Sequence, residues 1–99
     1  MAFKLEWSEE ALEDIESIAT YIEKDSPIYA KSVVSKFFEK AELLQEFSEI
    51  GRMVPELNDE AIREIFVYSY RLIYKVEETR VLLVAVVHGK RLLDNHLKW

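Results

Sequence analysis

Residues 62–87 read IREIFVYSYRLIYKVEETRVLLVAVV, and this stretch decides the fold. It contains three runs rich in β-branched and aromatic residues, at Ile62–Val67, Tyr70–Val76 and residues 81–87, and such runs are typical of strands. Only two and then four residues separate the runs, so we predict hairpins and an antiparallel sheet. The last run is apolar throughout, so it should be a central strand with helices on one face and something else, which could be a partner, on the other.

The first half of the chain predicts a strand followed by two helices. Residues 3–7 alternate between apolar and polar, as in a half-buried strand, whereas residues 8–24 and 27–47 carry apolar stripes of helical period. Ser8 and Ser26 are suitable N-caps, and the short break between the helices makes them an antiparallel hairpin. We predict an α+β fold of order β-α-α-β-β-β, with the hairpin packed on a small antiparallel sheet. The stripes comprise Ala11, Leu12, Ile15, Ile18, Ala19 and Ile22, then Ala30, Val33, Val34, Phe37, Ala41 and Leu44.

Gly51 and Pro55 mark the passage from the helices to the strands. We expect Gly51 to adopt the left-handed conformation that ends a helix or turns a loop. Pro55 should keep the neighbouring backbone extended until the first strand of the hairpins begins at Ile62.

The composition limits which classes of protein this chain can belong to. Ninety-nine residues, 49% of them apolar, predict one domain over residues 1–99. The chain has no cysteine, which excludes disulfides and thiolate nucleophiles and fits a reducing compartment. No signal peptide and no apolar run long enough to span a bilayer is present, so we expect a soluble cytoplasmic protein.

Charge is distributed unevenly along the chain. The net charge is −6, and residues 1–50 hold 5 Lys and Arg against 12 Asp and Glu, whereas residues 51–99 hold 8 against 7. The whole-molecule field therefore repels polyanions. A phosphate-binding face would have to be a local cluster in the second half.

Two arginines are predicted to lie within strands. Arg71 should face away from Tyr70 and Leu72, where it needs an acceptor. One interpretation is an ion pair with Glu64 or with a loop carboxylate, and the other is a contact to a phosphate or a partner. For Arg63 we favour a structural ion pair.

A second group of polar residues follows the last strand. His88 could act as a general acid or base, and Lys90 and Arg91 could stabilise a phosphate transition state, although such triplets also occur at solvated turns. Two histidines eight residues apart, without cysteine, predict no metal site. Gly-rich phosphate loops and a nucleophile turn are also absent from the sequence, so we expect no cofactor. The remaining possibilities for the function are binding surfaces or an arginine-assisted site.

Several motifs together resemble the RelE/ParE superfamily of bacterial toxins, and in particular its ParE branch, the plasmid-stabilisation toxins. They are Trp7-Ser8, Phe37-Phe38, Gly51-Arg52, Tyr70-Arg71-Leu72-Ile73-Tyr74 and His88-Gly89-Lys90-Arg91. The resemblance implies the toxin of a type II toxin–antitoxin pair, neutralised by a small antitoxin from the same operon that wraps around it. ParE toxins poison DNA gyrase, whereas RelE toxins cleave mRNA on the ribosome.

Only part of the RelE-type catalytic site is present in this sequence. Its two arginines match Arg71 and Arg91, but its two lysines fall at Ile62 and Glu64 and its tyrosine at about Leu97. A glutamate there would repel the scissile phosphate and pair with the arginine meant to bind it. We therefore expect a ParE-like toxin that inhibits gyrase by binding. The alternative is a RelE-like ribosome-dependent endoribonuclease that uses Arg71, His88 and Arg91.

The end of the chain is the expected target-binding region. Residues 90–99 should form a tail that the core does not need, with cations and a terminal tryptophan exposed, so that deletion of residues 92–99 should abolish toxicity. The candidate contact residues are Lys90, Arg91, His96, Lys98 and Trp99.

Overall fold

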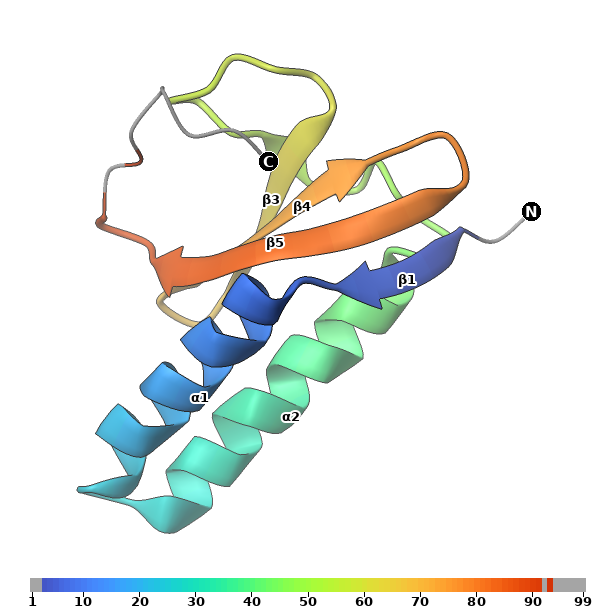
Figure 1. Ribbon diagram of the computed structural model, residues 1–99. Coiled ribbons are helices and arrows are strands. Elements are labelled where there is room, and N and C mark those ends of the chain that lie inside the picture. Colours follow the sequence, from blue (N-terminus) through green and yellow to red (C-terminus); the bar gives the residue numbers. More distant parts are fainter. Residues whose placement is uncertain (1–2, 92, 94–99) are drawn as a thin grey trace.

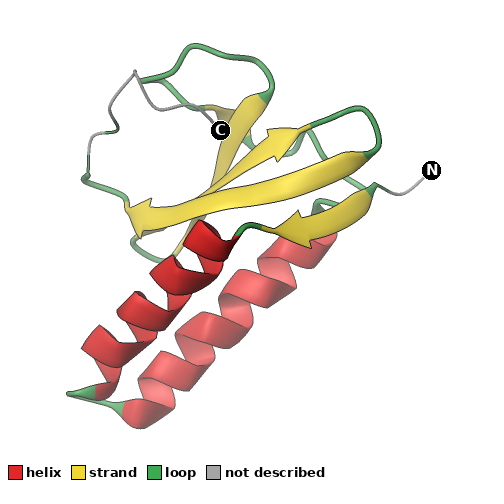
Figure 2. Ribbon diagram, viewed as in Figure 1, coloured by secondary structure: helices red, strands yellow, loops and turns green. Residues whose placement is uncertain are grey.

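The computed structural model describes residues 3–91 and 93 and contains two helices and a five-stranded sheet (Figure 1). The elements are β1 Lys4–Trp7, α1 Glu9–Glu23, α2 Pro27–Leu43, β2 Arg52–Met53, β3 Ile62–Val67, β4 Tyr70–Val76 and β5 Arg80–His88. The helices form a hairpin against one face of the sheet (Figure 2), with α1 packed on β5 and α2 on β3. The predicted α+β class and element order are confirmed. The two-residue β2 is an addition, because so short a strand has no recognisable periodicity.

The strand order is β1-β5-β4-β3-β2, which places β5 inside the sheet as predicted. The pairs β3–β4 and β4–β5 are antiparallel hairpins. By contrast, β1 pairs parallel to β5, from Lys4 opposite Arg80 to Trp7 opposite Leu83. The sheet is therefore mixed rather than wholly antiparallel.

Both helices begin at the predicted caps. Ser8 Oγ accepts a hydrogen bond from the Ala11 N–H (3.0 Å), and Ser26 Oγ accepts one from the Tyr29 N–H (3.1 Å). α2 ends at Leu43 rather than at residue 47, because the next turn tightens into bonds that reach back three residues, as from Glu46 N–H to the Leu43 carbonyl. The buried residues of the two helices are Ala11, Ile15, Ile22, Ala30, Val33, Phe37 and Ala41.

A register shift in β5 exchanges the faces of its side chains. Ile73 is opposite Ala85 and Tyr74 is opposite Leu83, so Val84 has no partner in β4. Before the shift Val81 and Leu83 face the helices, and after it Val86 does. Val84, Ala85 and Val87 lie on the other face, in a cluster with Val54, Leu57, Ile62, Ile73, Leu82 and Leu93. The face of β5 that points away from the helices is thus covered in part by the chain's own loop of residues 54–61. This loop lies across the sheet from the helices (Figure 1).

Gly51 does not adopt the predicted left-handed conformation, since no glycine in the described part of the chain has a positive φ. It is required for close approach instead. A Cβ atom at Gly51 would lie 2.5 Å from the Glu64 carbonyl oxygen and 2.6 Å from the Tyr74 hydroxyl oxygen. The Gly51 N–H donates to that hydroxyl (2.9 Å), which fixes the loop against β4.

Candidate functional site

Arg71 lies on the sheet face opposite the helices and is enclosed by two carboxylates. Its side chain is only 4% exposed. Nε donates to Glu64 Oε1 (2.6 Å), Nη1 to Glu56 Oε2 (2.7 Å) and Nη2 to Glu56 Oε1 (2.8 Å). The interpretation of Arg71 as a structural ion pair is confirmed, with both Glu64 and a loop carboxylate as partners.

The ion pair extends into a network of alternating charges that we call the Arg71 cluster: Arg52, Glu56, Glu64 and Arg71. Arg52 Nε donates to Glu64 Oε2 (2.6 Å), and its guanidinium lies 5.3 Å from the centre of the Phe66 ring. Among the described residues, every buried side-chain nitrogen and oxygen has a hydrogen-bond partner. The cluster is electrically neutral, so it offers no surplus positive charge to a phosphate.

Hydrogen bonding shifts the ionisation of this cluster. The pKa of Glu56 falls from its ordinary value of 4.5 to about 2, chiefly because Arg71 donates to its carboxylate. The same contact with Glu56, followed by that with Glu64, raises the pKa of Arg71. Glu56 and Arg71 therefore both stay charged at neutral pH.

A lowered pKa makes stability depend on pH in a definite direction. Glu56 is deprotonated more readily in the folded than in the unfolded chain, so its contribution is complete above about pH 4.5 and is lost as pH falls towards 2. We expect the free energy of unfolding, measured by urea denaturation, to fall by about 2 kcal/mol more in the native chain than in a Glu56→Gln variant between about pH 6 and pH 3. Identical pH profiles for the two proteins would contradict this assignment.

Arg63 has no ion-pair partner among the described residues, contrary to the ion pair that we favoured for it. Its Nη1 donates to the carbonyl oxygen of Gly51 (2.9 Å), a backbone group in the loop that follows α2. Arg63 thus helps to hold this loop against β3.

His88 and Arg91 line an open cleft between α1 and the ends of β4 and β5, with a volume of about 420 Å³. The His88 ring packs edge-on against Tyr70 with centroids 5.7 Å apart, and its Nδ1 accepts the Lys90 N–H (3.2 Å). His88, Lys90 and Arg91 are all exposed. The cleft is lined by Asp14, Ser17, Ile18, Tyr21, Tyr70, Val86, Val87, His88 and Arg91.

The sheet separates the three residues of the ribonuclease alternative. His88 is opposite Tyr70 on the helix face, whereas Arg71 is opposite Val87, which belongs to the cluster on the other face. Only the side chains of His88 and Arg91 share a cleft. Arg91 meets Arg71 through its backbone, because the Arg91 carbonyl oxygen accepts from Arg71 Nη1 (3.0 Å).

Asp14 and Tyr70 supply further polar groups to the cleft that sequence reasoning did not select. Asp14 Oδ2 accepts the Val86 N–H (2.9 Å), and burial raises the pKa of its carboxyl. Burial also raises the pKa of the Tyr70 hydroxyl, as do the neighbouring Tyr29 and Tyr21. Asp14 lies on a helix full of acidic residues, so the sequence carries no signal that marks it out.

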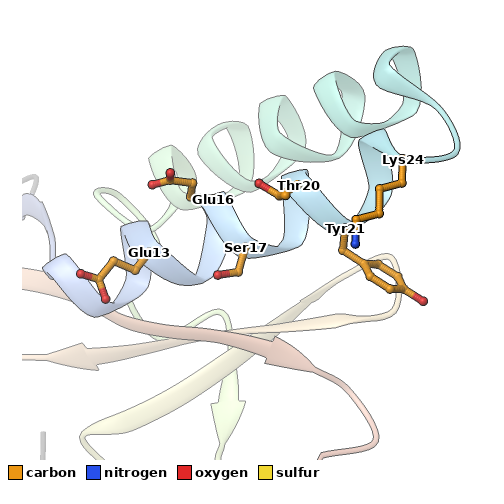
Figure 3. Close-up of a pocket in the computed structure, with 6 residues that line it drawn as sticks. All are labelled: Glu13, Glu16, Ser17, Thr20, Tyr21 and Lys24. Carbon is orange, nitrogen blue, oxygen red and sulfur yellow. The ribbon is translucent and has the colours of Figure 1, made fainter.

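A hollow on the outside of α1 is lined by side chains that do not converge on a common point. Figure 3 shows that its six side chains come from α1 and its C-cap residue Lys24 and point in different directions. Within residues 3–91 and 93, His, Asp and Glu form no group suited to a metal ion. Neither helix is long and apolar enough to cross a membrane.

Leu93 belongs to the core rather than to the tail in which we had placed it. Leu93 is only 8% exposed and belongs to the buried cluster that contains Ile73 and Val84, and its N–H donates to Glu56 Oε2 (3.1 Å). The core thus includes Leu93, whereas we had expected it to need no residue of the tail. The candidate contact residues His96, Lys98 and Trp99 lie outside the described part of the chain.

Three solved structures share this fold. The chromosomal ParDE toxin–antitoxin system from P. aeruginosa contains a chain that is 17% identical with a TM-score of 0.74, over 90% of this chain and 98% of that one. A mutant of the E. coli toxin RelE in the free state is 22% identical with a TM-score of 0.65, over 91% and 86% of the two chains. The YoeB dimer from Staphylococcus aureus is 17% identical with a TM-score of 0.63, over 89% and 98%.

Sequence comparison identifies the branch. No curated protein is significantly similar to the chain in sequence. Residues 5–93, however, match the family described as the ParE toxin of the type II toxin–antitoxin system parDE. The match begins at Leu5, within β1, and ends at the buried Leu93, so it includes most of β1 and every other helix and strand described above. The chain therefore belongs to the ParE toxin family of type II toxin–antitoxin systems.

Proposed function

We propose that this ParE family member inhibits DNA gyrase by binding to it, and that a co-encoded antitoxin neutralises it in the cytoplasm. Family membership implies a cognate antitoxin as partner. The observation that carries the choice of target is the enclosure of Arg71 by Glu56 and Glu64.

An mRNA nuclease would need Arg71 to reach a phosphate. That contact would require breaking two ion pairs around a side chain that is 4% exposed, and Glu64, which is fully buried, would remain beside the RNA. The net charge of −6 adds a long-range repulsion of RNA. A protein–protein contact needs no positive field of this kind.

The RelE-like alternative depends on the cleft that holds His88 and Arg91. Histidine and arginine side chains lining one cleft are suited to acid–base work on a phosphodiester. Ribosomes programmed with mRNA separate the two functions: we expect no new cuts from the purified protein. Codon-specific cuts that disappear in a His88→Ala variant would favour the alternative.

We propose the C-terminal residues as the target contact, with Lys90, Arg91, His96, Lys98 and Trp99 as candidates. Deletion of residues 94–99 leaves Leu93 in the core, so the truncated chain should fold and still bind antitoxin. We expect it to lose toxicity by about 100-fold or more, because the loss of a Trp anchor and its neighbours typically costs several kcal/mol of binding. The measurement is colony formation after induced expression.

Antitoxin capture controls for folding in the truncated chain. Retained toxicity together with retained antitoxin capture would place the gyrase contact elsewhere on the molecule.

A further inference from the structure

After β5 the chain is fastened to the Arg71 cluster by two backbone groups. The Arg91 carbonyl oxygen accepts from Arg71 Nη1 (3.0 Å), and the Leu93 N–H donates to Glu56 Oε2 (3.1 Å). Between these two points lies a single residue. Arg91 and Leu93 are therefore both tied to one buried ion pair.

The ion pair is itself fixed by three separate parts of the fold. Arg71 belongs to β4, Glu64 to β3, and Glu56 to the loop of residues 54–61. Glu56 binds Arg71 through both carboxylate oxygens, and such a two-point contact fixes orientation as well as distance. One of those oxygens, Oε2, also receives the Leu93 N–H.

We infer that Glu56 and Arg71 form a latch that fixes the backbone at Arg91 and Leu93, and that target binding by the C-terminal residues depends on the latch. The second half of this inference rests on the proposed function. Both residues are positioning residues, because they act on the target through the segment they hold. The side chain of Arg71, which the RelE pattern assigns to RNA, here serves to hold the chain's own backbone.

Burial of Leu93 alone does not explain this arrangement. Its side chain belongs to the buried cluster that contains Ile73 and Val84, which would hold residue 93 near the sheet without setting the orientation of its peptide group. The two hydrogen bonds add that orientation. The latch therefore requires the carboxylate of Glu56, whereas the packing of Leu93 does not.

Hydrogen exchange at the Leu93 amide tests the latch directly. We expect Glu56→Ala to accelerate this exchange about 10-fold or more, because an amide loses a charged acceptor, whereas the amides of the β4 residues Leu72 and Ile73 should stay protected. Glu56→Gln keeps an acceptor oxygen and should restore part of the protection. Glu77→Ala is the matched control, since Glu77 also binds an arginine, Arg80, but at the distant β4–β5 turn. If Glu56→Ala does not fold, the exchange rate of the Leu93 amide in Glu56→Gln is compared with that in Glu77→Ala, and faster exchange in Glu56→Gln supports the latch.

Equal protection of the Leu93 amide in the Glu56 variants and the control would overturn the latch. Toxicity then tests its consequence: a folded Glu56→Ala chain should be about 10-fold or more less toxic than Glu77→Ala. If deletion of residues 94–99 abolishes toxicity but Glu56→Ala does not reduce it, the dependence on the latch is wrong. If that deletion leaves toxicity unchanged, the proposed contact region fails, while the exchange result still decides whether the latch exists.

Discussion

Replacing Arg71 with alanine should lower the free energy of unfolding by about 3–5 kcal/mol, because Glu56 loses its two-point contact and the buried Glu64 keeps only the exposed Arg52 as a partner. Glu64 is fully buried and Glu56 is 17% exposed, so water cannot replace the guanidinium. Arg71→Lys should recover only part of the loss, since an ammonium group cannot make the two-point contact with Glu56 while also reaching Glu64. Chemical denaturation of the three proteins provides the measurement.

Arg80 offers a matched control for this prediction. It also binds two carboxylates, Glu6 and Glu77, but its side chain is 37% exposed. Because water screens such a pair, Arg80→Ala should cost only a small part of the Arg71→Ala loss. Equal losses at the two arginines would show that Arg71 is not the buried structural charge described here.

Phe37→Ala should cost about 3–5 kcal/mol of unfolding free energy, the usual range for a fully buried phenylalanine. Phe37 has no exposed surface and packs edge-on against Tyr70, with ring centroids 5.7 Å apart. Its removal leaves a cavity between α2 and the sheet. Thermal or urea denaturation of the variant gives the loss.

The adjacent Phe38 is the natural comparison. It is 38% exposed and contacts Trp7 at a centroid distance of 4.8 Å, so Phe38→Ala should cost about 1 kcal/mol. A loss below about 1 kcal/mol for Phe37→Ala would mean that this stripe of α2 is a partner surface rather than the core.

Local patterns predicted most of the fold. The bounds of β3 and β4 agree with the predicted runs, and the helices begin at the predicted serine caps, because these features depend on residues a few positions apart. The parallel pairing of β1 with β5 joins residues more than seventy positions apart. No local pattern carries that information.

The site was predictable only where its members lie in regular strands. Alternation placed Arg71 on the face opposite Tyr70, and that placement is confirmed. Glu56 lies in an irregular loop, so nothing in its neighbourhood assigned it to Arg71. His88 was proposed together with Arg71, but a register shift of one residue at Val84 turns the end of β5 over and puts His88 on the other face.

Gyrase supercoiling in the presence of the purified protein tests the proposed function most directly. We predict that the protein inhibits supercoiling or traps cleaved DNA, that added antitoxin reverses the effect, and that the chain lacking residues 94–99 has none. Full gyrase activity in the presence of a folded chain that arrests growth and binds its antitoxin would contradict gyrase as the target.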